Sequence, residues 1–265
     1  MTRFFSLILA VFCLFSVMER AEAQAQNTVF FGFGRANVYD TYLSPIEYAG
    51  PEMNVNVSTE RHLKRNPHIL FHTNSQIHVG WLHNPLKIAH EANGSLSHDF
   101  GYSYRWNNAL PRLSLDAGLT VGAAIGGTYN NQNGNNPAQG RASMRMSIVG
   151  QARYVLPVKK HRLELTYRAR LPFFGAMFSP GYGQSYYNIF AQGNWDGNIL
   201  ATHPGNALSF HHRFTIGLPL ARRTWVIGYE SLLEQAKPNN LKQHHYSRSF
   251  VIGWTLGRTP KHAKP

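Results

Sequence analysis

The sequence predicts an all-β protein, namely a transmembrane antiparallel up-and-down β-barrel of about ten strands with long extracellular loops. Three observations predict this fold. Long segments alternate between apolar and polar residues, and short and long connections alternate between those segments. The chain is also rich in aromatic residues (13%) and poor in charged ones (15%). Together these features are typical of barrels that cross an outer membrane.

The clearest predicted strand is Arg141 to Val155, where Met144 and Ile148 fall on one face and Arg145 and Ser147 on the other. Arg112–Gly126 and Arg162–Leu171 alternate in the same way. These segments exceed the ~5–6 residues of ordinary strands and reach the ~9–11 needed to cross a membrane. We expect Leu119, Met144, Ile148 and Leu165 to face lipid. Weaker alternation predicts seven more strands, at Thr28–Tyr39, Glu52–His62, His68–His83, Ser95–Trp106, Leu208–Leu218, Thr224–Glu234 and His245–Leu256.

The connections between these segments set the topology. The short ones are Leu63–Pro67, Asn107–Pro111, Pro157–His161 and Pro219–Arg223. The long ones are Asp40–Pro51, Asn84–Gly94, Tyr129–Gln139, Phe173–Asn206 and Gln235–Lys242. Outer-membrane barrels have short periplasmic turns and longer external loops. Ten strands fit this pattern, and twelve fit if the longest loop contains a hairpin around Tyr186–Phe190.

The N-terminus has the features of a secretory signal peptide. Arg3 precedes the apolar run from Phe4 to Val17, and Ala21-Glu22-Ala23 offers a small-x-small cleavage site. We therefore expect residues 1–23 to be removed and 24–265 to form a single barrel domain with a short basic C-terminal tail in the outer membrane. The one cysteine, Cys13, lies in the signal, so the mature chain cannot form disulfides.

The net charge of +13 restricts the partners. Export, and the lack of a basic helix or an RNA-binding motif, argue against nucleic acid. Outer-membrane lipids and the phosphates of lipopolysaccharide are compatible with a basic exported chain.

Charged residues on the inward faces predict a polar lumen network. One interpretation is a lumen plugged by ion pairs, because small barrels are nearly filled by their own side chains. The alternative is a pore for small anionic solutes. The residues that we expect to carry the network are Asp116, Arg145, Arg153, Glu164, Arg168, Arg170, His211 and Arg213.

The sequence shows no clear catalytic, metal or cofactor site. Ser209 and His211 share a face, with Glu230 on the next strand, which leaves a barrel lipid hydrolase as a second alternative. The histidine pairs His211-His212 and His244-His245 split across two faces, and His68, His72 and His78 share a face at wide spacing. None has partners at zinc-site intervals. We therefore predict that the protein binds no metal and has no catalytic residue.

The longest loop, Phe173–Asn206, is rich in aromatic residues, which predicts an ordered segment. We expect it to cap the barrel mouth. The rings of Tyr186, Tyr187 and Phe190 would then pack against the inner wall or neighbouring loops, with hydroxyls near Arg170, Arg213 or His211. A recognition surface for an unidentified surface ligand or protein is the function that this prediction favours.

Three loop segments resemble the hallmarks of a known family. They are Asp40-Thr41-Tyr42-Leu43-Ser44-Pro45, Asn135-Asn136-Pro137-Ala138-Gln139 and Met177-Phe178-Ser179-Pro180-Gly181-Tyr182-Gly183-Gln184-Ser185-Tyr186-Tyr187. The family consists of exported Bacteroidales proteins described only as a domain of unknown function (DUF 3316). The resemblance covers nearly the whole mature chain. It implies a source and a length, and no activity, ligand or catalytic residue.

Overall fold

The computed structural model describes residues 25–134, 136–158, 161–220 and 223–256, and strands make up most of them. One short helix, α2 (Tyr186–Phe190), and a 3-10 turn, η1 (Pro238–Asn240), lie in the loops. The strands are β1 (Ala25–Asp40), β2 (Tyr48–His62), β3 (Ile69–His83), β4 (His90–Leu110), β5 (Leu113–Asn130), β6 (Ala138–Val158), β7 (His161–Phe178), β8 (Ile199–Thr202), β9 (Ser209–Leu220), β10 (Arg223–Ala236) and β11 (Gln243–Leu256).

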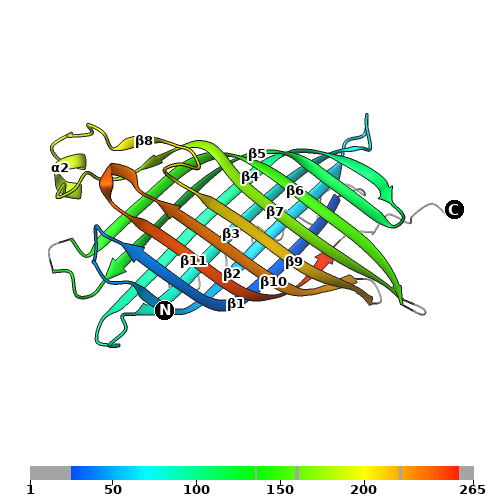
Figure 1. The fold of residues 1–265 in the computed structure, drawn as a ribbon, viewed down its shortest axis with the longest axis horizontal. Coiled ribbons are helices and arrows are strands. Elements are labelled where there is room, and N and C mark those ends of the chain that lie inside the picture. The colour runs from blue at the N-terminus through cyan, green and yellow to red at the C-terminus, as the bar shows by residue number, and fades with distance from the viewer. Residues whose placement is uncertain (1–24, 135, 159–160, 221–222, 257–265) are drawn as a thin grey trace.

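Ten of these strands close into an antiparallel barrel. Each long strand pairs with its neighbour in the chain, β7 pairs with β9, and β11 returns to β1. Figure 1 shows the strands running obliquely to the long axis of the barrel. The four-residue strand β8 pairs only with the end of β7 and lies outside the ring. The predicted ten-strand barrel is confirmed.

All five long connections lie at one end of the barrel, which we call the loop end, and α2 extends from it (Figure 1). The other end, the turn end, carries the short connections. The possible hairpin at Tyr186–Phe190 is wrong, because these residues form the helix α2. Ser185 caps this helix, since its hydroxyl accepts a hydrogen bond from the Asn188 backbone N–H at 3.2 Å.

Several strands extend further towards the loop end than the sequence predicts. β4 starts at His90 instead of Ser95, and β5 continues to Asn130. The polar inward residues of these extensions bond to one another: Asn130 donates to Glu91 at 2.9 Å, and Thr128 donates to Asn93 at 2.9 Å. Polar residues of this kind resemble a loop in the sequence, although here they line the barrel mouth.

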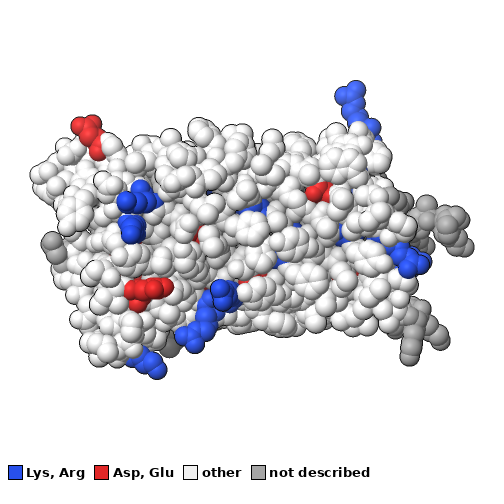
Figure 2. Space-filling model, in the orientation of Figure 1, with Lys and Arg blue, Asp and Glu red and all other residues white. Residues whose placement is uncertain are grey.

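The outer wall is apolar, as the alternation predicts. Leu119, Met144 and Ile148 are each at least half exposed on it, and Leu165 is half-buried on the same face. Figure 2 shows few charged side chains on the visible face of the wall. Among the described residues, no helix is both long enough and apolar enough to cross a bilayer.

Small apolar clusters inside the barrel lie towards its two ends. Near the loop end, inward side chains of β1, β2 and β3 pack with Ala89, and the cluster is Ala36, Val38, Tyr48, Leu82 and Ala89. Nearer the turn end, Phe30 packs with Val226 and Val251. Buried polar side chains occupy the lumen between and around these clusters. The predicted signal peptide (residues 1–23) and the basic C-terminal tail lie outside the described residues.

Candidate functional site

The candidate site is the network of charged side chains in the lumen, together with the loops above it. Towards the turn end, Glu60 on β2 is the centre of the network. Its carboxylate accepts hydrogen bonds from Arg153 at 2.9 Å, Gln151 at 3.0 Å and Arg105 at 3.3 Å. Arg168 Nη1 lies 4.0 Å from the same carboxylate. A single inward carboxylate therefore connects four neighbouring side chains.

Asp116 and Glu164 each form an ion pair with an arginine. Arg105 donates two hydrogen bonds to Asp116, both at 2.6 Å. Arg153 Nε lies 2.9 Å from Glu164 Oε1. Arginine suits such contacts, because its planar guanidinium matches the fork of a carboxylate.

Two more carboxylates, those of Asp99 and Glu230, pair with arginines in the middle of the lumen. Arg170 donates to Asp99, and Arg145 reaches the same carboxylate at 3.4 Å. Glu230 accepts from Gln76 at 2.5 Å and lies 3.4 Å from Arg213.

Arg213 is held by two further contacts. It donates to Asn56 at 3.0 Å and stacks over the Phe30 ring at 4.1 Å. The guanidinium is almost fully buried, and these contacts hold it on several sides.

Many of these contacts join strands that are not neighbours. Gln76 on β3 bonds to Glu230 on β10, and Arg145 on β6 donates to Glu234 on β10 at 3.0 Å. Such bonds cross the lumen instead of following the wall, so the side chains link opposite sides of the barrel.

All eight predicted network residues lie in the lumen, and each has a charged or polar partner there. Arg168 and His211 have the longest contacts: Arg168 Nη1 lies 4.0 Å from Glu60, and His211 Nε2 lies 3.5 Å from Glu230. The sequence reasoning missed Glu60, Glu234 and Gln76. Glu52, Asn54, Asn56, Ser58 and Glu60 are five polar residues at alternate positions of one strand, and this pattern could have identified Glu60.

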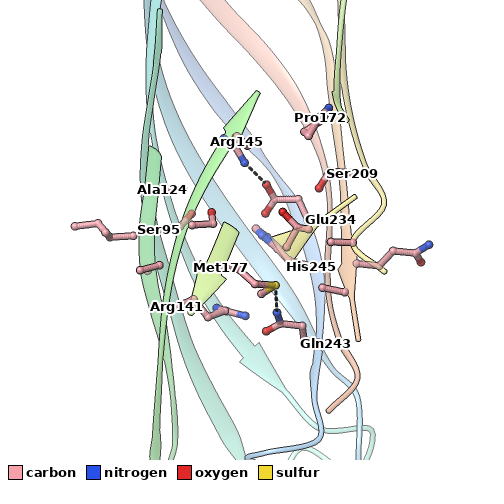
Figure 3. Close-up of a pocket in the computed structure, with 18 of the residues that line it drawn as sticks. Ser95, Ala124, Arg141, Arg145, Pro172, Met177, Ser209, Glu234, Gln243 and His245 are labelled. Carbon is pink, nitrogen blue, oxygen red and sulfur yellow. Dashed lines mark hydrogen bonds and ion pairs between the residues drawn. The ribbon is translucent and has the colours of Figure 1, made fainter. Parts of the chain in front are cut away.

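A cavity of about 140 Å³ opens above the network near the loop end. Its polar side chains include those of Arg141, Arg145, Ser209, Glu234 and His245, and its apolar surface includes Pro172 and Met177. Figure 3 shows these side chains converging from several strands, with the Arg145–Glu234 pair marked. The cavity is large enough for a few water molecules or a small ligand group.

The longest loop is held by polar side chains of its own and of the β10–β11 loop. Gln184 accepts from the Gly181 backbone N–H at 2.8 Å and from Asn198 at 2.7 Å. Asn239, in the β10–β11 loop, donates to the Ser179 and Gly197 carbonyls at 3.2 and 2.9 Å.

The motif residue Tyr186 anchors the loop to the barrel rim. Its hydroxyl donates to Gln139 Oε1 at 2.9 Å, and its ring meets Tyr42 edge-on with the centroids 6.1 Å apart. Burial raises the pKa of Tyr186 to about 12, so the phenol remains a hydrogen-bond donor.

Three details of the predicted loop packing are wrong. Tyr187 is 67% exposed and Phe190 61%, so neither ring is buried against the inner wall. The Tyr186 hydroxyl bonds to Gln139 at the rim instead of to Arg170, Arg213 or His211. The physical reason is that α2 extends beyond the end of the barrel (Figure 1). In addition, the arginines inside the lumen are already paired with carboxylates.

The other motif residues differ in their surroundings. Ser179 and Pro180 are buried, whereas Tyr182 is 87% exposed. Gly183 has a positive φ of 73°, a conformation that glycine adopts without a steric cost.

The geometry of Ser209, His211 and Glu230 does not support a catalytic triad. His211 faces Glu230, but Ser209 is paired in register with Glu234 and lines the cavity. Among the described residues, no hydrogen bond joins Ser209 to His211. A nucleophile needs a base within hydrogen-bonding reach.

A closed ring of ten antiparallel strands, apolar outside and charged inside, defines an outer-membrane β-barrel. The chain is similar to several solved barrel structures. The outer membrane protease OmpT from Escherichia coli matches with a TM-score of 0.53 at 7% identity, over 88% of this chain and 96% of that one. The transport unit of the autotransporter AIDA-I from Escherichia coli gives a TM-score of 0.42 at 6% identity (89% and 90% covered). The attachment invasion locus protein Ail of Yersinia pestis gives 0.35 at 10% identity (88% and 99% covered).

At these identities the likeness concerns the fold alone. No curated protein sequence matches the chain. The family model described as a protein of unknown function (DUF3316) matches residues 5–256, and the chain belongs to this family.

Proposed function

We propose that this protein is a surface-exposed outer-membrane barrel with a closed lumen, whose ordered loops recognise a ligand or protein outside the cell. The observation that carries the proposal is the combination of a lumen crossed by ion pairs with a loop that is held rigidly but exposes aromatic rings.

The closed lumen is supported by contacts that join distant strands. Gln76 with Glu230 and Arg145 with Glu234 cross the bore, and apolar side chains pack near both ends. A solute pore would instead need a continuous water path past these groups. Loops also meet over the mouth, since Asn133 donates to the Leu43 carbonyl at 3.0 Å from the opposite side of the ring.

The recognition surface is supported by four exposed aromatic side chains of the longest loop. Tyr182 is 87% exposed, Tyr187 67%, Phe190 61% and Trp195 47%. Phe190 and Trp195 pack edge-to-face at 4.9 Å, so these rings are ordered although water reaches them. Exposed aromatic clusters mark binding surfaces, because burying such rings contributes a large free energy at little entropic cost.

The proposal extends to location and partners. We infer a Bacteroidales source, export by a cleaved signal at residues 1–23, a mature chain 24–265, and a loop end facing outward. Lipopolysaccharide and other outer-membrane lipids surround the apolar wall. N-terminal sequencing of protein purified from outer membranes tests the cleavage directly, because the mature chain should begin at Gln24.

Planar-bilayer conductance tests the closed lumen. The wild-type barrel should give no steady ion current, whereas Arg145→Ala together with Glu234→Ala should open intermittent channels. A steady anion-selective current through the wild-type protein would favour the pore.

Cell-surface binding tests recognition. Cells that display the wild-type barrel and cells that display Tyr187→Ser/Phe190→Ser should be compared for adhesion to host epithelial cells and to immobilised mucin. Wild-type adhesion that the double variant loses supports the proposal, and equal adhesion by both contradicts it. A Leu119→Ala variant on the lipid-facing wall is the matched control, because its loops are unchanged.

A further inference from the structure

Three potential metal ligands meet inside the barrel, below the loop end. Glu52 on β2, His78 on β3 and His245 on β11 place a carboxylate oxygen and two imidazole nitrogens within 4.8 Å of one another. The three residues are only 1%, 3% and 6% exposed. Glu52 and His78 come from consecutive strands, but His245 comes from the last strand, so spacing along the chain could not reveal the three together.

The local sequence makes room for this meeting. The two residues paired with Glu52 in the sheet ladders are glycines, Gly34 on β1 and Gly80 on β3. Neither ladder partner therefore places a side chain beside Glu52, which leaves room for the two imidazoles. On β11, Ser247 donates its hydroxyl to Glu52 Oε1, which fixes the carboxylate between the two imidazoles.

Both imidazoles already point at this carboxylate. His78 Nδ1 lies 2.9 Å from Oε1, and His245 Nε2 lies 2.6 Å from Oε2. A carboxylate only accepts hydrogen bonds, so these two nitrogens carry protons in this arrangement. In the other tautomer each ring presents a lone pair at the same position, which is the form that binds a metal ion.

We propose that Glu52, His78 and His245 form a binding site for a divalent transition-metal ion of the Zn²⁺ type. Two imidazoles and one carboxylate are a known ligand set for zinc. Ligand atoms of a tetrahedral ion are separated by roughly 3.3 Å at the usual bond lengths. Small side-chain rotations reach this spacing from the present one. Ser247 supplies the outer hydrogen bond that orients the carboxylate.

The surroundings give a cation access to the site. His245 and Glu234 line the cavity at the loop end, and Figure 3 shows both facing it. An ion can thus enter from the loop side, and a water molecule in the cavity can occupy the fourth coordination position.

The test is Zn²⁺ titration of the untagged, full-length barrel refolded in detergent, in competition with a chromophoric chelator. The wild-type protein should bind one Zn²⁺ per chain. Glu52→Gln, His78→Gln and His245→Gln should each weaken binding about 100-fold or more, since even outer partners contribute 10–100-fold. His72→Gln is the matched control, because His72 is an equally buried lumen histidine on β3 without a carboxylate hydrogen bond.

Absence of stoichiometric binding by the wild-type protein would overturn the proposal. So would unchanged affinity in the double variant His78→Gln/His245→Gln. If the variants do not fold, the zinc X-ray absorption spectrum of the wild-type complex tests whether histidines bind the ion. Scattering from two imidazoles is expected, and a spectrum without imidazole ligands refutes the site. The proposal is independent of surface recognition, since a loop variant should keep its zinc affinity.

Discussion

The ion pair between Asp99 and Arg170 provides the sharpest test of the lumen network. Asp99 is 2% exposed and Arg170 7%. Among the described residues, Asp99 is the only carboxylate within ion-pair distance of Arg170. Asp99→Asn therefore leaves a buried guanidinium uncompensated, which costs about 3–5 kcal/mol. Arg145 adds little to this loss, because it keeps Glu234 at 3.0 Å.

Glu164→Gln is the matched control. The Glu164 side chain is 24% exposed, and Arg153 keeps Glu60 at 2.9 Å after the change. We expect a loss of about 1 kcal/mol or less, as for solvent-accessible pairs. The free energy of unfolding should be measured by urea titration in lipid vesicles, with tryptophan fluorescence as the signal.

A double variant separates charge from packing. Asp99→Asn/Arg170→Met removes both charges, so it should be more stable than Asp99→Asn alone. Equal losses for Asp99→Asn and Glu164→Gln would refute the reasoning, because they would show that water reaches the whole network equally.

Four further predictions concern the wall and the loop. Ile148→Arg on the lipid face should reduce insertion into vesicles by about 2–4 kcal/mol, while Gln151→Arg in the lumen should insert normally; similar insertion of both would contradict the assigned faces. In limited proteolysis of whole cells, the Asn/Gly-rich loop 130–136 should be cut readily while 179–206 resists, and equal cleavage would show that the long loop is mobile. Tyr186→Phe should speed cleavage of that loop, because it removes the hydrogen bond to the rim. Burial raises the pKa of Tyr186 from 10.0 to about 12, so loop protection should be complete below pH 10 and fall between pH 10 and 12. Protection unchanged at pH 12 would exclude this titration.

The sequence predicts the wall of the barrel well, because lipid imposes strict alternation on every outward face. Met144 and Ile148 are assigned by this period alone. The inward positions of Arg145 and Arg153 follow from the same alternation. What alternation cannot give is the partner of each arginine, since that depends on which strands lie opposite across the lumen.

The missed features each have a physical cause. The extension of β4 to His90 could not be predicted because Glu91 and Asn93 look like loop residues, although each accepts a hydrogen bond inside the mouth. The sequence pattern could not predict the helix α2, because five residues are too few to show a helical period. Ser185 is nevertheless a favourable helix cap. The cluster of Glu52, His78 and His245 depends on ring closure, which brings β11 within reach of β2 and β3.

That closure also has a kinetic consequence. The first and last strands join in a seam of fourteen residue pairs, from Asn27 with Leu256 to Asp40 with Gln243. The partners are more than 200 positions apart in the chain, so the seam must form late, after the intervening strands have assembled. Once it has formed, the ring has no free edge from which unzipping can start. The folded barrel should therefore persist because its unfolding barrier is high, and its lifetime should exceed what its free energy of unfolding alone would suggest.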